Sequence, residues 1–155
     1  MKKELNVSAL KNGTVIDHIP AKALFNVINI LKLEKCGDGM ITFGTNLDSN
    51  RFGQNGKKGI IKIADVFFEE SDINKIALVA PTAVLNVIKD YEVADKKKIS
   101  MPKTIIGIVK CQNPVCVTNN EPVMQKYEVV SSAPVALRCY YCEKVTEEHD
   151  FKLID

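Results

Sequence analysis

Residues 14–33 read TVIDHIPAKALFNVINILKL, a strand-like segment that runs directly into a helix-like one. The β-branched residues of 14–19 predict a strand, and Pro20 ends it in a backbone conformation suited to the first turn of a helix. From residue 21 to residue 33 the apolar side chains recur at spacings of three and four, which predicts an amphipathic helix. The residues of this apolar face are Leu24, Val27, Ile28 and Leu31.

Strand and helix patterns continue over the first hundred residues. In order, they predict a strand at 41–47, a Gly/Asn-rich loop at 48–59, a strand at 60–66, a helix at 73–80 behind the acidic segment 69–72, and strands at 83–88 and 91–94 around a turn at 89–90. With the first strand and helix, the order is β-α-β-β-α-β. This order predicts an α+β fold of the ferredoxin-like type, in which both helices cover one face of an antiparallel sheet.

Composition and charge exclude several classes of protein. The chain is 46% hydrophobic and 26% charged, which is typical of a globular protein rather than a disordered or fibrous one. Its net charge of +2 is far below the basic excess expected of a nucleic-acid-binding protein. The longest uncharged stretch, 76–88, contains Pro81 and is too short to span a bilayer, and no secretory signal opens the chain. We therefore expect a cytoplasmic protein with no membrane partner.

The cysteines and one charged segment predict a second domain. Four of the five cysteines lie in the last 45 residues, and the charged, Pro-containing segment 94–103 is typical of a short linker. We therefore expect a larger domain at 1–98 and a small antiparallel β domain at 99–155. The remaining cysteine, Cys36, is interpreted as a small buried hydrophobic residue.

Two cysteine pairs predict a metal site in the small domain. The pairs are Cys111-x4-Cys116 and Cys139-x2-Cys142. In a reducing compartment clustered thiols indicate metal ligands before disulfides, and four thiolates leave no open coordination position. The expected ion is a structural zinc, with a rubredoxin-like iron as the alternative on ligand chemistry. About 50 residues bury too little apolar surface to fold reliably unaided, and the metal would supply the missing stability.

Side-chain cations are the candidates for holding an anion in the first domain, because no Gly-rich phosphate loop is present. They are Lys57, Lys58, Lys62, Lys96, Lys97 and Lys98. The run 96–98 has the alternative interpretation of a solvated linker. Asp17 and His18 are polar residues inside an apolar strand, and each is either a hydrogen-bonded structural residue or a ligand-binding one.

Three classes of function remain open from these features. A non-catalytic protein that holds an anion through the placed lysines and uses the closed metal site for structure is the first. A zinc-ribbon nucleic-acid adaptor is the alternative, although residues 101–155 carry a net charge of −1 that four thiolates and Zn²⁺ would make more negative. A small metal-dependent enzyme is the third, and a metal with no open position argues against it. Docking onto another protein is the better hypothesis for the small domain.

Several motifs together resemble one protein family over essentially the whole chain. They are GTVIDHIP at 13–20, Asn46-Leu47, Lys62-Ile63, Ala80-Pro81, Asn86, Tyr91-Glu92-Val93, the two cysteine pairs, Asn120-Glu121-Pro122 and CYYCE at 139–143. This pattern resembles the regulatory chain of aspartate carbamoyltransferase.

The resemblance implies a non-catalytic subunit of pyrimidine biosynthesis. It implies an N-terminal allosteric domain that binds CTP as inhibitor and ATP as activator, and a zinc domain that docks on the catalytic chains. It also implies homodimers of regulatory chains that link catalytic trimers into a dodecamer, with effectors shifting a two-state equilibrium of another polypeptide.

The resemblance also implies roles for individual residues. By matching position, Asp17 and Lys62 would hold the ribose. His18 and Lys96 would contact the phosphates, with help from Lys58. The base pocket would be lined by Ala9, Leu10, Val15, Asn86, Ile88, Tyr91 and Val93.

Overall fold

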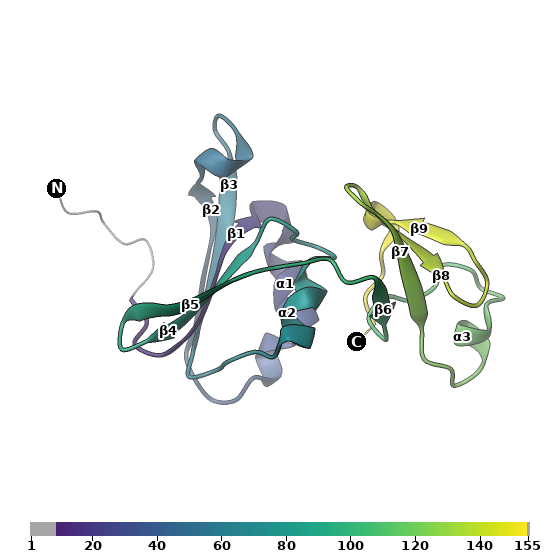
Figure 1. Cartoon of the computed structure of the whole chain (residues 1–155), viewed down its shortest axis with the longest axis horizontal. Coiled ribbons are helices and arrows are strands. Elements are labelled where there is room, and N and C mark those ends of the chain that lie inside the picture. The colour runs from purple at the N-terminus through teal and green to yellow at the C-terminus, as the bar shows by residue number, and fades with distance from the viewer. Residues whose placement is uncertain (1–8, 155) are drawn as a thin grey trace. The chain divides into compact units, whose positions relative to one another are not determined.

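The computed structural model describes residues 9–154 and divides the chain into two units, one ending at Ser100 and the other beginning at Met101 (Figure 1). No helix in the described part of the chain is long and apolar enough to cross a membrane.

The first unit is a five-stranded antiparallel sheet with two helices. The sheet order is β2-β3-β1-β4-β5, the arrangement expected when two β-α-β halves interlock and a hairpin adds one edge strand. This confirms the predicted α+β class. The elements are β1 (Gly13–Pro20), α1 (Leu24–Leu31), β2 (Ile41–Asp48), β3 (Lys57–Ala64), α2 (Glu70–Ile76), β4 (Val84–Lys89) and β5 (Glu92–Lys98).

Both helices pack on the same face of this sheet (Figure 1). The central strands contribute Ile16, Ile61 and Leu85 to the core, and each of these side chains is at most 1% exposed. Leu24 of α1 and Ile76 of α2 pack against these side chains from the helix layer. Burying one such side chain stabilises the fold by about 1.5–3 kcal/mol. Because alternate residues of a strand point to opposite faces, the neighbours of these core residues lie on the face opposite α1 and α2. No helix among the described residues of the first unit packs on this face, which is called the uncovered face below.

The first helix is shorter than its apolar pattern predicts. Residues 21–23 and 33–35 form 3-10 turns on either side of α1. Lys32 adopts a left-handed conformation with φ of 52°, which ends the α-helix. The second helix begins earlier than its apolar pattern predicts, because the acidic side chains of Glu70 and Asp72 are favourable in the first turn of a helix.

Two segments predicted to be loop or linker are strands. β3 begins at Lys57, where it pairs with Asp48 of β2, so the hairpin is longer than the Gly/Asn-rich composition indicated. β5 extends to Lys98, so the lysine run belongs to an edge strand, where charged side chains face solvent at low cost. The connecting turn is Asp90-Tyr91 rather than 89–90, with φ of 51° and 68°, typical of a two-residue hairpin loop.

A β-bulge in β1 changes which side chains face the core. The register of β1 against β3 shifts between Ile16 and Ile19, and His18 has a φ of 58°. The extra residue lets both isoleucines reach the core although they are three positions apart. Asp17 and His18 occupy the bulge, which is why two polar residues fit an otherwise apolar strand.

The second unit is a small four-stranded antiparallel sheet of order β6-β7-β8-β9. Its described core is small and includes Ile105, Tyr127 and Leu137 together with buried cysteines. Its elements are β6 (Thr104–Ile106), α3 (Val117–Asn120), β7 (Lys126–Ser132), β8 (Val135–Cys139) and β9 (Val145–Glu147).

Candidate metal centre and ligand-binding face

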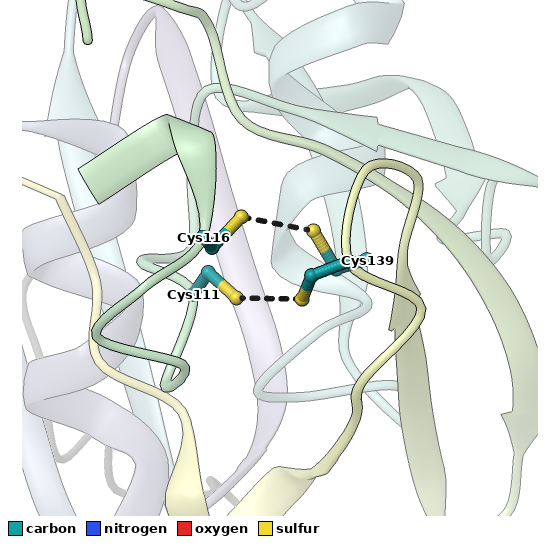
Figure 2. A group of neighbouring side chains, drawn as sticks. Cys111, Cys116 and Cys139 are labelled. Carbon is teal, nitrogen blue, oxygen red and sulfur yellow. Dashed lines mark hydrogen bonds between the residues drawn. The ribbon is translucent and has the colours of Figure 1, made fainter. Parts of the chain in front are cut away.

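Four cysteine side chains converge in the second unit. Cys111 and Cys116 lie in the segment that leads into α3, Cys139 ends β8, and Cys142 lies in the turn before β9. Their sulfur atoms all lie within 4.8 Å of one another. Figure 2 shows the sulfurs of Cys111 and Cys116 pointing towards the loop that carries Cys139. The fold thus brings together all four predicted ligands.

The spacing of the sulfur atoms fits one tetrahedral ion. Cys111 Sγ and Cys142 Sγ are 3.6 Å apart, and Cys116 Sγ and Cys139 Sγ are 3.7 Å apart. A tetrahedral ion with metal–sulfur bonds of about 2.3 Å holds its ligands about 3.8 Å apart. These cysteines are free thiols rather than disulfides. The donor set is therefore that of a closed structural metal centre.

Electrostatics in the cluster also favour a bound cation. Partial burial raises the pKa of Cys142, but hydrogen bonds from the Lys144 backbone N–H, the Asn113 side chain and the neighbouring thiols together outweigh this effect, and the pKa falls to about 7. Burial and neighbouring thiols raise the pKa of Cys111 to about 12. Thiolates this close repel one another, and the positive charge of a divalent ion would offset that repulsion.

A buried hydroxyl beside the cluster points to the same conclusion. Tyr127 lies opposite Cys139 in the register of β7 and β8. Its hydroxyl is buried and has no hydrogen-bond partner among residues 9–154. An ionised sulfur is an acceptor, so a metal-bound thiolate would give this O–H the partner it lacks.

The uncovered face of the first sheet carries a second candidate site. Register partners on antiparallel strands lie side by side on one face. One row crosses four strands and consists of Lys62 on β3, Val15 on β1, Asn86 on β4 and Lys96 on β5. Two lysines that are far apart in the sequence thus lie at the two ends of the row, with an apolar side chain and an amide side chain between them.

The face is apolar at one end. Ile88 pairs in register with Gly13 and with Val93. A Cβ atom at Gly13 would lie 3.0 Å from Leu10 Cδ2, so Leu10 lies over this glycine. The backbone N–H of Tyr91 donates to the carbonyl oxygen of Lys11 at 2.9 Å, which holds the segment before β1 beside the β4–β5 turn. Tyr91 and Val93 are 65% and 59% exposed, leaving apolar surface open to a ligand.

The opposite end of the face is charged. The Asp17 carboxylate lies 2.9 Å from the Lys58 ammonium and accepts the backbone N–H of His18 at 2.6 Å. Burial raises the pKa of Asp17, but these two donors outweigh it and the pKa is lowered. Burial lowers the pKa of Lys62, and the Asp17 carboxylate opposes that shift.

His18 is surrounded mainly by positive charge. Partial burial lowers its pKa, and the attraction of Asp17 opposes this shift. The cations Arg51, Lys58 and Lys96 lower the pKa further. The Nδ1 atom of His18 is buried and has no hydrogen-bond partner in the described part of the chain. This end of the face is suited to an anion.

The structure places the residues to which the resemblance gives ligand roles along this face and its edges, with the exception of Ala9. Ala9 is exposed and precedes Leu10, and no contact assigns it to the face. Of the other candidate lysines, Lys57 and Lys97 lie on the opposite face of the sheet. Sequence reasoning missed Arg51 and Thr82, which meet His18 at the charged end. Neither residue lies in a periodic segment or a motif, so the sequence held no signal for them.

The fold and the two candidate sites define a protein of two units, an α+β unit with a face suited to an anionic ligand and a small β unit with a four-cysteine metal centre. Comparison with protein families matches residues 5–100 to "aspartate carbamoyltransferase regulatory chain, allosteric domain" and residues 103–152 to the metal binding domain of the same chain. The chain therefore belongs to the family of aspartate carbamoyltransferase regulatory chains. It is a regulatory rather than a catalytic chain, as the resemblance in sequence indicated.

Similar proteins cover nearly the whole chain. Aspartate carbamoyltransferase regulatory chains from Parabacteroides distasonis and Bacteroides fragilis are each 50% identical to it, over 149 and 153 residues. These alignments cover 96% and 99% of this chain and 94% and 97% of the relatives. The regulatory chain of Pyrococcus horikoshii is 47% identical over 148 residues, 95% of each chain. A zinc-ribbon nucleic-acid adaptor is not favoured by these matches.

Proposed function

We propose that the chain senses nucleotides for aspartate carbamoyltransferase, binding CTP as an inhibitor and ATP as an activator on the uncovered face of residues 1–98. The observation that carries this proposal is the gradient along that face, from an apolar end at Tyr91 and Val93 to a cationic end at His18. A nucleotide has the same gradient, with an apolar base, a polar ribose and anionic phosphates.

The roles of individual residues follow this gradient. Leu10, Val15, Asn86, Ile88, Tyr91 and Val93, with Ala9 nearby, would line the base pocket. Asp17 and Lys62 would hold the ribose hydroxyls, since a carboxylate accepts and an ammonium donates hydrogen bonds. His18, Lys58 and Lys96 would bind the phosphates. The effectors would act by preferring one of two states of the assembled complex.

The metal domain has a structural role in this proposal. Residues 99–155 would bind one zinc ion through Cys111, Cys116, Cys139 and Cys142, and the folded domain would dock on the catalytic chain. Homodimers of regulatory chains would then link catalytic trimers into a cytoplasmic dodecamer that regulates pyrimidine biosynthesis. The ion itself would stabilise the domain and, with four sulfur ligands, take no part in chemistry.

Calorimetric titration of CTP into the zinc-loaded full chain, with ATP as competitor, tests the proposal. Saturable binding that ATP displaces is the expected result, because both effectors would share one site. Absence of binding by either nucleotide would contradict it.

A pair of neighbouring lysines gives a sharper test. Lys96 pairs in register with Asn86, on the uncovered face, whereas Lys97 pairs with the core residue Leu85, on the helix-covered face. Lys96→Ala should therefore weaken CTP binding by about tenfold, the loss expected for a hydrogen bond to a charged group. Lys97→Ala removes the same charge one residue away and should leave the affinity nearly unchanged. Equal effects of both variants would contradict the assignment of the face.

A further inference from the structure

Arg51 is tied to the charged end of the ligand-binding face by a chain of hydrogen bonds. It lies in the 3-10 turn Asn50–Phe52 between β2 and β3, and its backbone N–H donates to Ser49 Oγ at 3.3 Å. Its guanidinium Nη1 donates to the carbonyl oxygen of Thr82 at 3.3 Å. The Thr82 hydroxyl in turn donates to the carbonyl oxygen of His18 at 3.1 Å. Three segments far apart in the sequence therefore meet at one point.

The charges at this point leave a surplus of positive charge. Asp17 is the carboxylate that acts on His18, and it is already paired with Lys58 at 2.9 Å. The charges of Arg51 and Lys96 also act on His18. Arg51 is exposed, so the guanidinium donors that do not contact Thr82 can reach an incoming anion.

The dimensions of the face place Arg51 beyond the ribose. Ile88, at the apolar end, and Val84, which pairs with Asp17, are four residues apart on β4. At about 3.3 Å per residue the two positions are separated by about 13 Å, enough for a base and a ribose. The phosphates of a nucleotide that lies along this face would extend past Asp17 towards His18 and the turn that carries Arg51.

We propose that Arg51 binds the terminal phosphate and makes the site selective for nucleoside triphosphates over diphosphates and monophosphates. This inference rests on the proposed nucleotide site and adds to it a residue that distinguishes nucleotides by their number of phosphates. The planar guanidinium presents its donors in a fixed fork that matches two phosphate oxygens, which an ammonium does not. The bond to Thr82 fixes one edge of the guanidinium and so positions the other N–H groups.

Calorimetric titration of CTP, CDP and CMP into the zinc-loaded full chain tests the inference. The wild-type chain should bind CTP more tightly than CDP. Arg51→Ala should lose about tenfold or more in CTP affinity while its affinities for CDP and CMP stay within about twofold of wild type. Arg51→Lys should recover only part of the loss, because the charge remains but the fork does not. Retained CMP binding shows that the variant site is folded.

Lys57→Ala is the matched control. Lys57 is a cation of the same hairpin that pairs with Asp48, and the alternation of β3 places it on the face opposite Lys58 and Lys62. Its removal should leave all three affinities unchanged. An equal fall in CTP, CDP and CMP affinity in Arg51→Ala, or unchanged CTP affinity, would overturn the inference while leaving the nucleotide site standing. Absence of binding of all three nucleotides to the wild-type chain would overturn both.

Discussion

The carboxylate of Asp17 and the ammonium of Lys58 lie 2.9 Å apart on neighbouring strands, with side chains only 22% and 20% exposed. This pair lies at the bulge of β1, where the backbone N–H of His18 also donates to Asp17. The pair shows why a strand of the core can carry an acid: its charge is compensated on the open face of the sheet, away from the helices.

Because of the Asp17–Lys58 pair, the free energy of unfolding should fall at acid pH. Because the pKa of Asp17 is lowered in the folded chain, its contribution is complete above the unfolded pKa of about 3.9 and is lost as pH falls through the folded pKa. Lys58→Met should raise the pKa of Asp17 and lower the free energy of unfolding at pH 7 by about 1 kcal/mol. Carboxyl NMR titration and urea denaturation measure the two effects. An unchanged Asp17 pKa in the variant would contradict the pairing.

Nucleotide binding should take up a proton at His18. The pKa of His18 is lowered in the free chain by burial and by Arg51, Lys58 and Lys96, and phosphates beside it would raise that pKa. Between the free and bound pKa values, CTP affinity should therefore rise as pH falls. Calorimetry near pH 6.5 in buffers of different ionisation enthalpy measures the uptake. Binding heats that do not depend on the buffer, or uptake that persists in His18→Gln, would contradict this prediction.

Metal removal should unfold the second unit alone. Structural zinc sites supply about 10–16 kcal/mol in small peptides, and the described core of this unit is small. Cys116→Ser, or a thiol-reactive mercurial, should abolish stoichiometric zinc binding and collapse the amide NMR signals of residues 101–155 while those of the first unit persist. Cys36→Ser is the control, since Cys36 lies outside the cluster and packs against the first core. A native second unit without metal would be incompatible with this role.

Gly13→Ala should strongly destabilise the first unit. Gly13 has a φ of 142°, and an added Cβ would lie 2.1 Å from the carbonyl oxygen of Ile63 on the neighbouring strand. We expect a loss of about 3 kcal/mol or more in unfolding free energy, measured by urea denaturation. Gly37→Ala separates the cost of the positive φ from the cost of the clash. Gly37 also has a positive φ, of 82°, but no atom lies within 4 Å of the added Cβ. Its expected cost is about 1–2 kcal/mol, and equal losses in the two variants would exclude the clash.

Local patterns in the sequence account for much of the fold. The β-branched run before Pro20 and the apolar spacing after it predicted β1 and α1, because backbone preference and periodicity are properties of neighbouring residues. The acids of 69–72 marked the start of α2. The cysteine pairs predicted a metal centre, since two closely spaced pairs of cysteines are the typical ligand pattern of a four-thiolate metal site.

Strand register and long-range contacts were decided only by the tertiary structure. The sequence shows Lys96 and Lys97 as members of one charged run, and only the pairing of β5 with β4 places them on opposite faces. The bulge at His18 exists because Ile16 and Ile19 both reach the core against β3 and the helices. Arg51 meets Thr82 across 31 residues of sequence. Such relationships depend on which strands pair and in what register, and the burial of the whole core, rather than any local preference, selects that arrangement.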